Sequence, residues 1–306
     1  MSEEVEKELR KIPIISWLVR KCKKIILPGL EGLSLYDLWE IYSVGIIKGT
    51  FTTRAGSIAF SFFMALFPFL LFILNLIPFV WFIDDFQLKL LTFIDTLLPP
   101  QTITFFSEVF LDIAQTPRGG LLSFAFILSV FLSANGINSI FTGFEYSYHT
   151  TINRTILRQY MVAVIVATII AFLLLVTVIV LVYLTYIIED LEALGVFSDS
   201  IIWAQIGRFV VFILMIYNAI AILYYFGTKE GKHSRYFSVG ALFTTLLIFL
   251  TSFLFSIYIE NFSSYNELYG SIGALLILML YIWLNSNILL LGFELNASIN
   301  RLKKNF

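Results

Sequence analysis

The uncharged stretch from Gln159 to Ile188, QYMVAVIVATIIAFLLLVTVIVLVYLTYII, decides the fold class of this chain. Crossing the ~30 Å hydrocarbon core of a bilayer takes about 20 apolar residues in a helix, and this stretch is longer. Backbone groups inside lipid find no water, so a lone apolar stretch satisfies them best as a helix. Five further uncharged runs are long enough to cross: Ala55 to Ile83, Gly119 to Phe144, Phe209 to Thr228, Tyr236 to Ile259, and Leu268 to Phe293. The sequence therefore predicts an all-α polytopic membrane protein with six transmembrane helices.

The composition agrees with a membrane protein and excludes an ordinary soluble one. Of the 306 residues, 59% are hydrophobic and 13% are charged, whereas a typical soluble domain is about 25% charged. The net charge of −1 gives no indication of a nucleic-acid partner. Cys22 is the only cysteine, which excludes an internal disulfide and a cysteine metal cluster. Basic and apolar residues mix between Lys11 and Leu27, so we expect no cleavable signal peptide.

The distribution of Lys and Arg predicts the direction of the spans. Nine of these residues lie in the region up to Arg54, and the segments on the same side of the membrane raise the total there to 17 of 20. The opposite side keeps Lys89, Arg118 and Arg208. Because positively charged segments stay in the cytoplasm, we expect both termini to be cytoplasmic.

This topology divides the chain into three parts. Residues 1–54 form a cytoplasmic, basic and amphipathic N-terminal region, residues 55–299 the six-span membrane domain, and residues 300–306 a basic cytoplasmic tail. The apolar residues of the segment 14–18 lie beside four basic ones, Arg20, Lys21, Lys23 and Lys24. This suits either a helix on an anionic leaflet or the ordinary basic flank of a first span. Over residues 84–118, apolar residues recur at near-helical spacing around Pro99-Pro100. This pattern predicts a hairpin of two short amphipathic surface helices on the outer face. We favour a hairpin packed on the spans over a substrate lid.

Amide side chains recur inside the predicted spans. Asn135 and Asn138 lie in the second span, Asn218 in the fourth, and Asn285 and Asn287 in the sixth. Amides in hydrocarbon need hydrogen-bond partners, so together they predict an interior polar seam. The seam has two interpretations that the sequence leaves open: hydrogen bonds that hold helices together, or a solvated cavity for a substrate.

The first span carries two local features. Pro68 lies near its middle, where the missing backbone N–H favours a kink. Ser57, Ser61 and Ala65 lie four residues apart, which predicts a small-residue face for close helix packing.

Glu294 ends the last uncharged run and requires an explanation. A helix of ~20 residues from near Ile272 leaves the hydrocarbon around Leu291, so we expect Glu294 at the cytoplasmic boundary without deep burial. Arg54 begins the first span from the same side and shares this depth, which predicts an ion pair; alternatively, each side chain reaches water separately. Gly292 lets a neighbouring backbone approach closely, or serves packing alone.

Three stretches resemble the YihY/virulence factor BrkB family of bacterial inner-membrane proteins: RAGSIAFSFFMALFPFLLF from Arg54, SANGINSIFTGFEYSY from Ser133, and YNELYGSIGALLILMLYIWLNSNILLLGFELNASI from Tyr265. The resemblance implies a six-span protein of the bacterial inner membrane. Older labels for members include ribonuclease and serum-resistance factor, and a transport role has been suggested. The positions that match the family's recurring residues are Arg54, Pro68, Tyr269, Gly270, Gly273, Gly292, Glu294 and Asn296.

The residues disfavour a ribonuclease or any other enzyme. The only histidines, His149 and His233, fall in separate loops, and no acids have metal-ligand spacing. YGSIGA lacks the Gly-x-Ser-x-Gly spacing of a nucleophile elbow. We therefore expect no cofactor and no nucleic-acid partner.

Two function classes remain. One is transport or lipid handling across or within the membrane, with membrane lipids and a small molecule or lipid as partners. The other is a structural or assembly factor of the envelope without a substrate. We favour the first because several amides lie in separate spans. No acid lies in the middle of a span as an ion site, and no feature indicates a substrate, a coupling ion or an oligomeric state.

Overall fold

Six long helices dominate the structure, a computed structural model that describes residue 36 and residues 50–80, 82–97, 122–145, 154–193, 200–228, 236–261 and 271–304. Each of these helices is long and apolar enough to cross a membrane, and each falls on one of the predicted runs. The prediction of an all-α protein with six candidate membrane spans is therefore confirmed. The helices are α4 (Thr50–Leu76), α7 (Leu122–Glu145), α8 (Ile156–Ala193), α9 (Ser200–Gly227), α10 (Val239–Asn261) and α12 (Ser271–Lys304).

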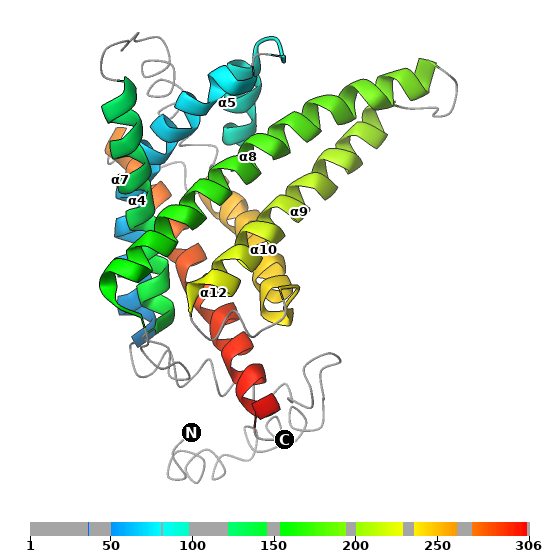
Figure 1. Ribbon diagram of the computed structural model, residues 1–306. Helices are drawn as coiled ribbons and strands as arrows, with labels where there is room; N and C mark the ends of the chain where they lie inside the picture. The colour runs from blue at the N-terminus through cyan, green and yellow to red at the C-terminus, as the bar shows by residue number, and fades with distance from the viewer. Residues whose placement is uncertain are drawn as a thin grey trace, which may run out of the picture.

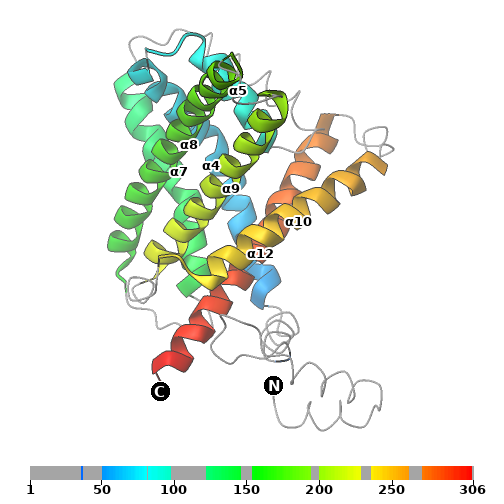
Figure 2. The ribbon, with the colours of Figure 1, turned by 90° about the vertical axis from the view of Figure 1, so that its right-hand side faces the viewer.

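The six helices pack as a closed ring (Figures 1 and 2). Around the ring the neighbours are α10, α12, α4, α7, α8 and α9, and α9 contacts α10 again. The most extensive contact joins α4 to α7. We call the end of the bundle where α4 begins and α12 ends the proximal end, and the opposite end the distal end. In Figure 2 the distal parts of α10 and α12 diverge from those of α8 and α9.

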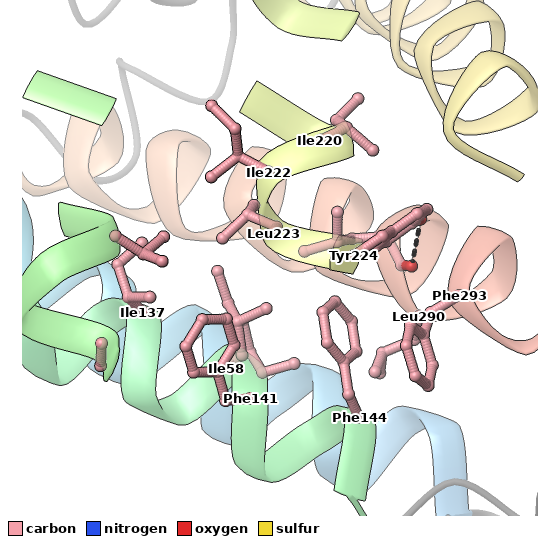
Figure 3. Close-up of a cluster of buried hydrophobic side chains, with 14 of the residues drawn as sticks. Ile58, Ile137, Phe141, Phe144, Ile220, Ile222, Leu223, Tyr224, Leu290 and Phe293 are labelled. Atoms are coloured by element: carbon pink, nitrogen blue, oxygen red, sulfur yellow. Dashed lines mark hydrogen bonds between the residues drawn. The ribbon is translucent and has the colours of Figure 1, made fainter. Parts of the chain in front are cut away.

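Buried side chains form two main hydrophobic cores. The proximal core draws on α4, α7, α8, α9, α10 and α12 and contains Phe141, Phe144, Tyr224, Leu290 and Phe293 (Figure 3). The distal core is built around the end of α4 and includes residues of α5, α8, α9 and α12. A smaller cluster of Phe255, Ile259 and Ile277 joins the distal halves of α10 and α12 only. The proximal end is thus where all six helices pack together.

The distal end carries a short amphipathic helix, α5 (Phe86–Leu97), after the 3-10 turn η1 (Ile77–Val80). Asp85 has a positive φ of 53° between them, a conformation that Asp tolerates better than most residues. Leu90, Phe93 and Ile94 of α5 are buried, whereas Leu88 is exposed. The first helix of the predicted hairpin is therefore present. The second helix, the Pro99-Pro100 break and the amphipathic segment of residues 14–24 lie outside the described residues.

The first span packs on the second through small residues, as its sequence predicts. Pro68 lies inside α4, which continues through it to Leu76. A Cβ on Gly136 of α7 would lie 3.0 Å from the Cβ of Ala65, so the two helices touch closely there. Ser139 of α7 donates a hydrogen bond to the carbonyl oxygen of Ser57 at 3.3 Å. These contacts tie α4 to α7 along its proximal half.

Candidate functional site

Arg54 and Glu294 form an ion pair at the proximal end. Arg54 Nη2 lies 3.4 Å from Glu294 Oε1, and the two side chains are only 12% and 5% exposed. Arg54 Nη1 also donates to the carbonyl oxygen of Gly143 at 3.0 Å, and its guanidinium lies 4.8 Å from the centre of the Phe51 ring. The predicted proximity is confirmed, and it joins α4, α7 and α12.

The expectation that Glu294 avoids deep burial is wrong. Glu294 is only 4% exposed. The helix α12 does not end near Leu291 but continues to Lys304, and its residues still pack against the bundle there. Leu295 and Ile299, beyond the carboxylate, are buried as well. Removing one partner from a buried ion pair leaves an uncompensated charge, which typically costs about 3–5 kcal/mol. The pair is therefore a structural constraint on this end of the bundle.

An aromatic layer lies at the same end (Figure 3). The rings of Phe144 and Phe293 stack with their centroids 4.1 Å apart and their planes 8° from parallel. Tyr224 meets both rings edge-on, at 5.6 Å from Phe144 and 5.8 Å from Phe293. Stacked and edge-to-face rings are the favoured aromatic arrangements. The layer links α7, α9 and α12 directly beside the residue that carries the buried carboxylate.

The Tyr224 hydroxyl joins three helices. It donates to the carbonyl oxygen of Leu289 in α12 at 2.7 Å and lies 2.6 Å from Thr244 Oγ1 in α10. A tyrosine hydroxyl has one proton to donate, so Thr244 is the donor in the second bond. Both side chains are buried. The bonds therefore hold α9, α10 and α12 at a fixed separation inside the proximal core.

Two glycines let α10 and α12 cross at close range. A Cβ on Gly292 would overlap the Thr244 hydroxyl and lie 2.6 Å from the Tyr224 hydroxyl. A Cβ on Gly240 would overlap the Gly292 carbonyl oxygen and approach the Asn296 amide. The predicted close approach at Gly292 is confirmed, and the approaching groups belong to α9 and α10.

Asn296 fastens the start of α10 to α12. Its Oδ1 accepts from the backbone N–H of Gly240 at 2.8 Å, and its Nδ2 donates to Ser238 Oγ at 2.7 Å. Ser238 Oγ also accepts from the N–H of Ala241 at 3.2 Å, which makes Ser238 the N-cap of α10. Two of the free N–H groups at this helix start are thus satisfied by side chains.

The other predicted amides are satisfied mainly within their own helices. Asn218, Asn285 and Asn287 each donate to the carbonyl oxygen four residues earlier, at 2.7, 2.9 and 2.8 Å. Asn218 Oδ1 also accepts from the hydroxyl of Tyr236 at 3.0 Å, and burial raises the pKa of that hydroxyl. Asn285 Oδ1 is buried and has no hydrogen-bond partner among the described residues.

The two amides of α7 differ in exposure. Asn138 is half-buried, whereas Asn135 is exposed on the surface of the bundle. The predicted seam therefore does not gather all five amides in the interior. Asn135 in particular faces away from the proximal core.

A second polar cluster at the proximal end joins α7 to α8. The amide of Gln159, which is buried, lies 3.0 Å from Thr142 Oγ1. In the amide orientation that suits its neighbours it donates to Glu145 Oε2 at 2.8 Å. Arg154, just before α8, donates to the carbonyl oxygen of Phe226 at 2.7 Å. Burial lowers the pKa of the Arg154 guanidinium, and the Glu145 carboxylate opposes that effect.

A family model described as virulence factor BrkB matches residues 46–305. The chain belongs to the virulence factor BrkB family. A Bacillus subtilis protein named YfkH and described as ribonuclease-like is 28% identical over 82% of this chain and 91% of its own length. A UPF0761 membrane protein of Alteromonas mediterranea is 33% identical over 28% of this chain and 30% of its own length. No solved structure matches this chain.

The positions first noted for their resemblance to the BrkB family separate into two groups in space. Arg54, Gly292, Glu294 and Asn296 take part in the contacts at the proximal end. Pro68 lies in the distal half of α4 and Gly273 is buried in the first turn of α12. Tyr269 and Gly270 lie outside the described residues.

Sequence reasoning missed several residues of this site, including Gly143, Tyr224, Gly240 and Thr244. Tyrosine, threonine and glycine are common in membrane helices, and every face of these helices is apolar, so no periodic pattern marks the inward side. The stretch that contains Glu145 resembles the family, but no charge spacing connects it to Arg154 or Gln159. Within the described ranges, no group of three or more His, Cys, Asp or Glu residues could hold a metal ion.

Proposed function

We propose that this BrkB-family protein transports or handles a lipid or small molecule across or within the bacterial inner membrane, with both termini in the cytoplasm. The proposal includes no catalytic step and no cofactor. The orientation is supported by the 17 Lys and Arg residues on one side of the spans, out of 20. The proximal end is then the cytoplasmic end of the bundle.

The observation that supports this proposal most directly is the unsatisfied oxygen of Asn285. It lies on α12 between the proximal contacts and the distal cluster of α10 and α12, and it is buried without a partner in the described part of the chain. A buried acceptor without a hydrogen bond costs about 1–3 kcal/mol. A water molecule or a substrate that donates a hydrogen bond to this oxygen would remove that cost. The amide would then serve as a binding point on a path through the bundle.

The surroundings of Asn285 are consistent with such a path. Polar contacts follow the α10–α12 interface at three levels in one antiparallel register. At the proximal level Asn296 bonds to Ser238, and at the next the Tyr224 hydroxyl bonds to both the Leu289 carbonyl oxygen and Thr244. At the third level the hydroxyls of Tyr281 and Ser252 lie 2.8 Å apart. Asn285 lies between the last two levels. The interface is thus polar at intervals along most of its length, although α10 and α12 are otherwise apolar.

The test is the accessibility of position 285 to water. Cys22 is replaced by serine, Asn285 by cysteine, and the protein is exposed in cells and in inverted vesicles to a membrane-impermeant thiol reagent. The matched control is Leu280→Cys, because Leu280 is an exposed residue of the same helix that faces lipid rather than the α10–α12 interface. We expect labelling at position 285 from at least one side, and none at position 280.

The outcome separates the two function classes. A structural or assembly factor without a substrate needs no aqueous route to Asn285, so absence of labelling from both sides would overturn the proposed transport. Labelling that added lipid extract or a solute suppresses at position 285, but not at a cytoplasmic control position, would identify the class of substrate.

A further inference from the structure

Asn135 is an exposed amide at the middle of a membrane span. It belongs to the span Phe126–Glu145, ten residues before the proximal end of that span, which is about 15 Å along a helix axis. This depth is close to the centre of a bilayer ~30 Å thick. Asn135 is exposed, and its side chain forms no hydrogen bond within the described part of the chain. Lipid tails offer no hydrogen-bond partner, and the described residues of this chain supply none to the amide.

The amide belongs to a small polar face on the surface of the α4–α7 pair. Ser139 lies one turn along α7 from Asn135, and its hydroxyl donates to the carbonyl oxygen of the exposed Ser57 in α4. Phe60 and Phe131, both exposed, flank these residues. We call Ser57, Asn135 and Ser139 the α4–α7 face. Small residues on a membrane helix let another helix approach closely.

Gly56 of α4 differs from the glycines that pack between helices. A Cβ on Gly56 would meet nothing within 4 Å. By contrast, Gly136, Gly143, Gly240 and Gly292 each lie against a neighbouring helix of the same chain. Glycine lowers helix stability relative to alanine, and no described residue occupies the space beside Gly56.

We propose that the α4–α7 face is the site where a second copy of this chain packs in the membrane, with the two Asn135 side chains hydrogen-bonded across a twofold axis. An amide carries both donors and an acceptor, so the same residue of a second copy satisfies it. In a twofold dimer each residue of the patch meets the same patch of the partner. Both copies keep one orientation in the membrane, as a shared topology requires.

A second copy fits this face better than a passing lipid headgroup. A headgroup path needs polar residues across the full thickness of the membrane. On the distal side of Asn135, the residues of α7 whose exposure is described and high are all apolar: Phe124, Ile127, Leu128, Phe131 and Leu132. The polar face therefore ends in the middle of the bilayer, as a single interhelical contact does.

The experiment is disulfide crosslinking in native membranes, after Cys22 is replaced by serine. Asn135→Cys is compared with Leu250→Cys, because Leu250 is exposed on α10, at a similar depth and across the ring from α7. A disulfide forms only where the two Cβ atoms come within about 4.5 Å. We expect the Asn135→Cys protein to form a species of twice the 35.0 kDa chain mass, and the Leu250→Cys protein to stay monomeric.

A second experiment measures self-association without introduced cysteines. Asn135→Leu and Ser57→Leu change exposed positions, so their melting temperatures as monomers should match the parent. We expect each to weaken self-association in nanodiscs or detergent about tenfold, in line with the strength of an interhelical amide contact. A monomeric parent, equal dimerisation of the Asn135→Leu protein, or crosslinking of position 135 only to a species of another mass would overturn the proposal. None of these outcomes depends on whether the protein transports a substrate.

Discussion

At the scale of single residues, the Arg54–Glu294 pair holds together three helices that are distant in the sequence. Each charge stabilises the folded state only when the other is present, because a buried charge without a partner is unfavourable. Arg54 has a second role, since it also donates to the Gly143 carbonyl oxygen. The two residues should therefore contribute unequally but not independently.

We predict that Glu294→Gln and Arg54→Gln each lower the free energy of unfolding by about 3–5 kcal/mol. The loss for Arg54→Gln should be the larger because the bond to Gly143 is also weakened. The double variant should lose less than the sum, since neither charge is then left alone. A double-mutant cycle on thermal unfolding in nanodiscs measures this.

Arg208→Gln is the matched control for this cycle. Arg208 is an exposed arginine that donates a 3.3 Å hydrogen bond to Thr185 Oγ1, and exposed polar contacts contribute little. Strictly additive losses for Arg54 and Glu294 would show that the two charges do not stabilise one another.

The residues that could be predicted from the sequence are those whose chemistry conflicts with lipid. Glu294 is an acid at the end of an uncharged run, and the shared depth of Arg54 was enough to predict its partner. Tyr224, Thr244 and Gly240 conflict with nothing in a membrane span, so their roles depend on which helices meet. The burial of Glu294 also needed the structure, because it depends on how far α12 continues to pack.

At the scale of elements, the crossing of α10 and α12 depends on the absence of side chains at two positions. Gly292 and Gly240 face one another, and the hydroxyls of Tyr224 and Thr244 occupy the space beside them. The six spans could be located from hydropathy alone, although their ends could not. The register of α10 against α12 could not, because it is fixed by these glycines and by Asn296.

We predict that Gly292→Ala destabilises the protein by about 1–3 kcal/mol or more, since its Cβ overlaps groups that are themselves hydrogen-bonded. Thr244→Ala in the same chain should recover part of the loss by removing one of those groups. Thermal unfolding of the single and double variants measures both effects.

Gly56→Ala supplies the comparison for a glycine in open space. Its Cβ meets nothing within 4 Å, so in the monomer this change should be neutral or stabilise by up to about 1 kcal/mol. Equal losses at positions 56 and 292 would mean that helix propensity, not the close crossing, governs Gly292.

At the scale of the whole molecule, the number of spans followed from the sequence but the ring of helices did not. Six uncharged runs are visible in any hydropathy reading. Membrane helices are apolar on every side, so the sequence does not mark which face of α9 meets α10, or that α12 lies beside α4. Contacts such as Tyr224 to Leu289 and Arg54 to Glu294 carry that information, and they join residues far apart in the chain.

We predict that a reporter enzyme active only outside the cytoplasm gives no signal when fused after Phe306. The reason is the excess of Lys and Arg on the side of both termini. The same reporter placed after Asp84, on the opposite side of the first span, should be active and serves as the control. Activity of the Phe306 fusion would reverse the proposed orientation.

We also predict that the purified protein does not cleave RNA, although its relative YfkH is described as ribonuclease-like. RNA hydrolysis needs a metal cluster or a nucleophile with a base. In the part of the chain that the structure describes, the buried acid Glu294 is paired with Arg54 and no acidic cluster suits a metal.

The measurement is incubation of detergent-purified protein with single-stranded and structured RNA, with Mg²⁺, Mn²⁺ and Zn²⁺ in turn. A mock preparation from cells that lack the chain reports contaminating nuclease. Cleavage above that control that disappears in a folded His149→Ala or His233→Ala variant would refute the prediction, because a contaminant would not respond to changes in this chain.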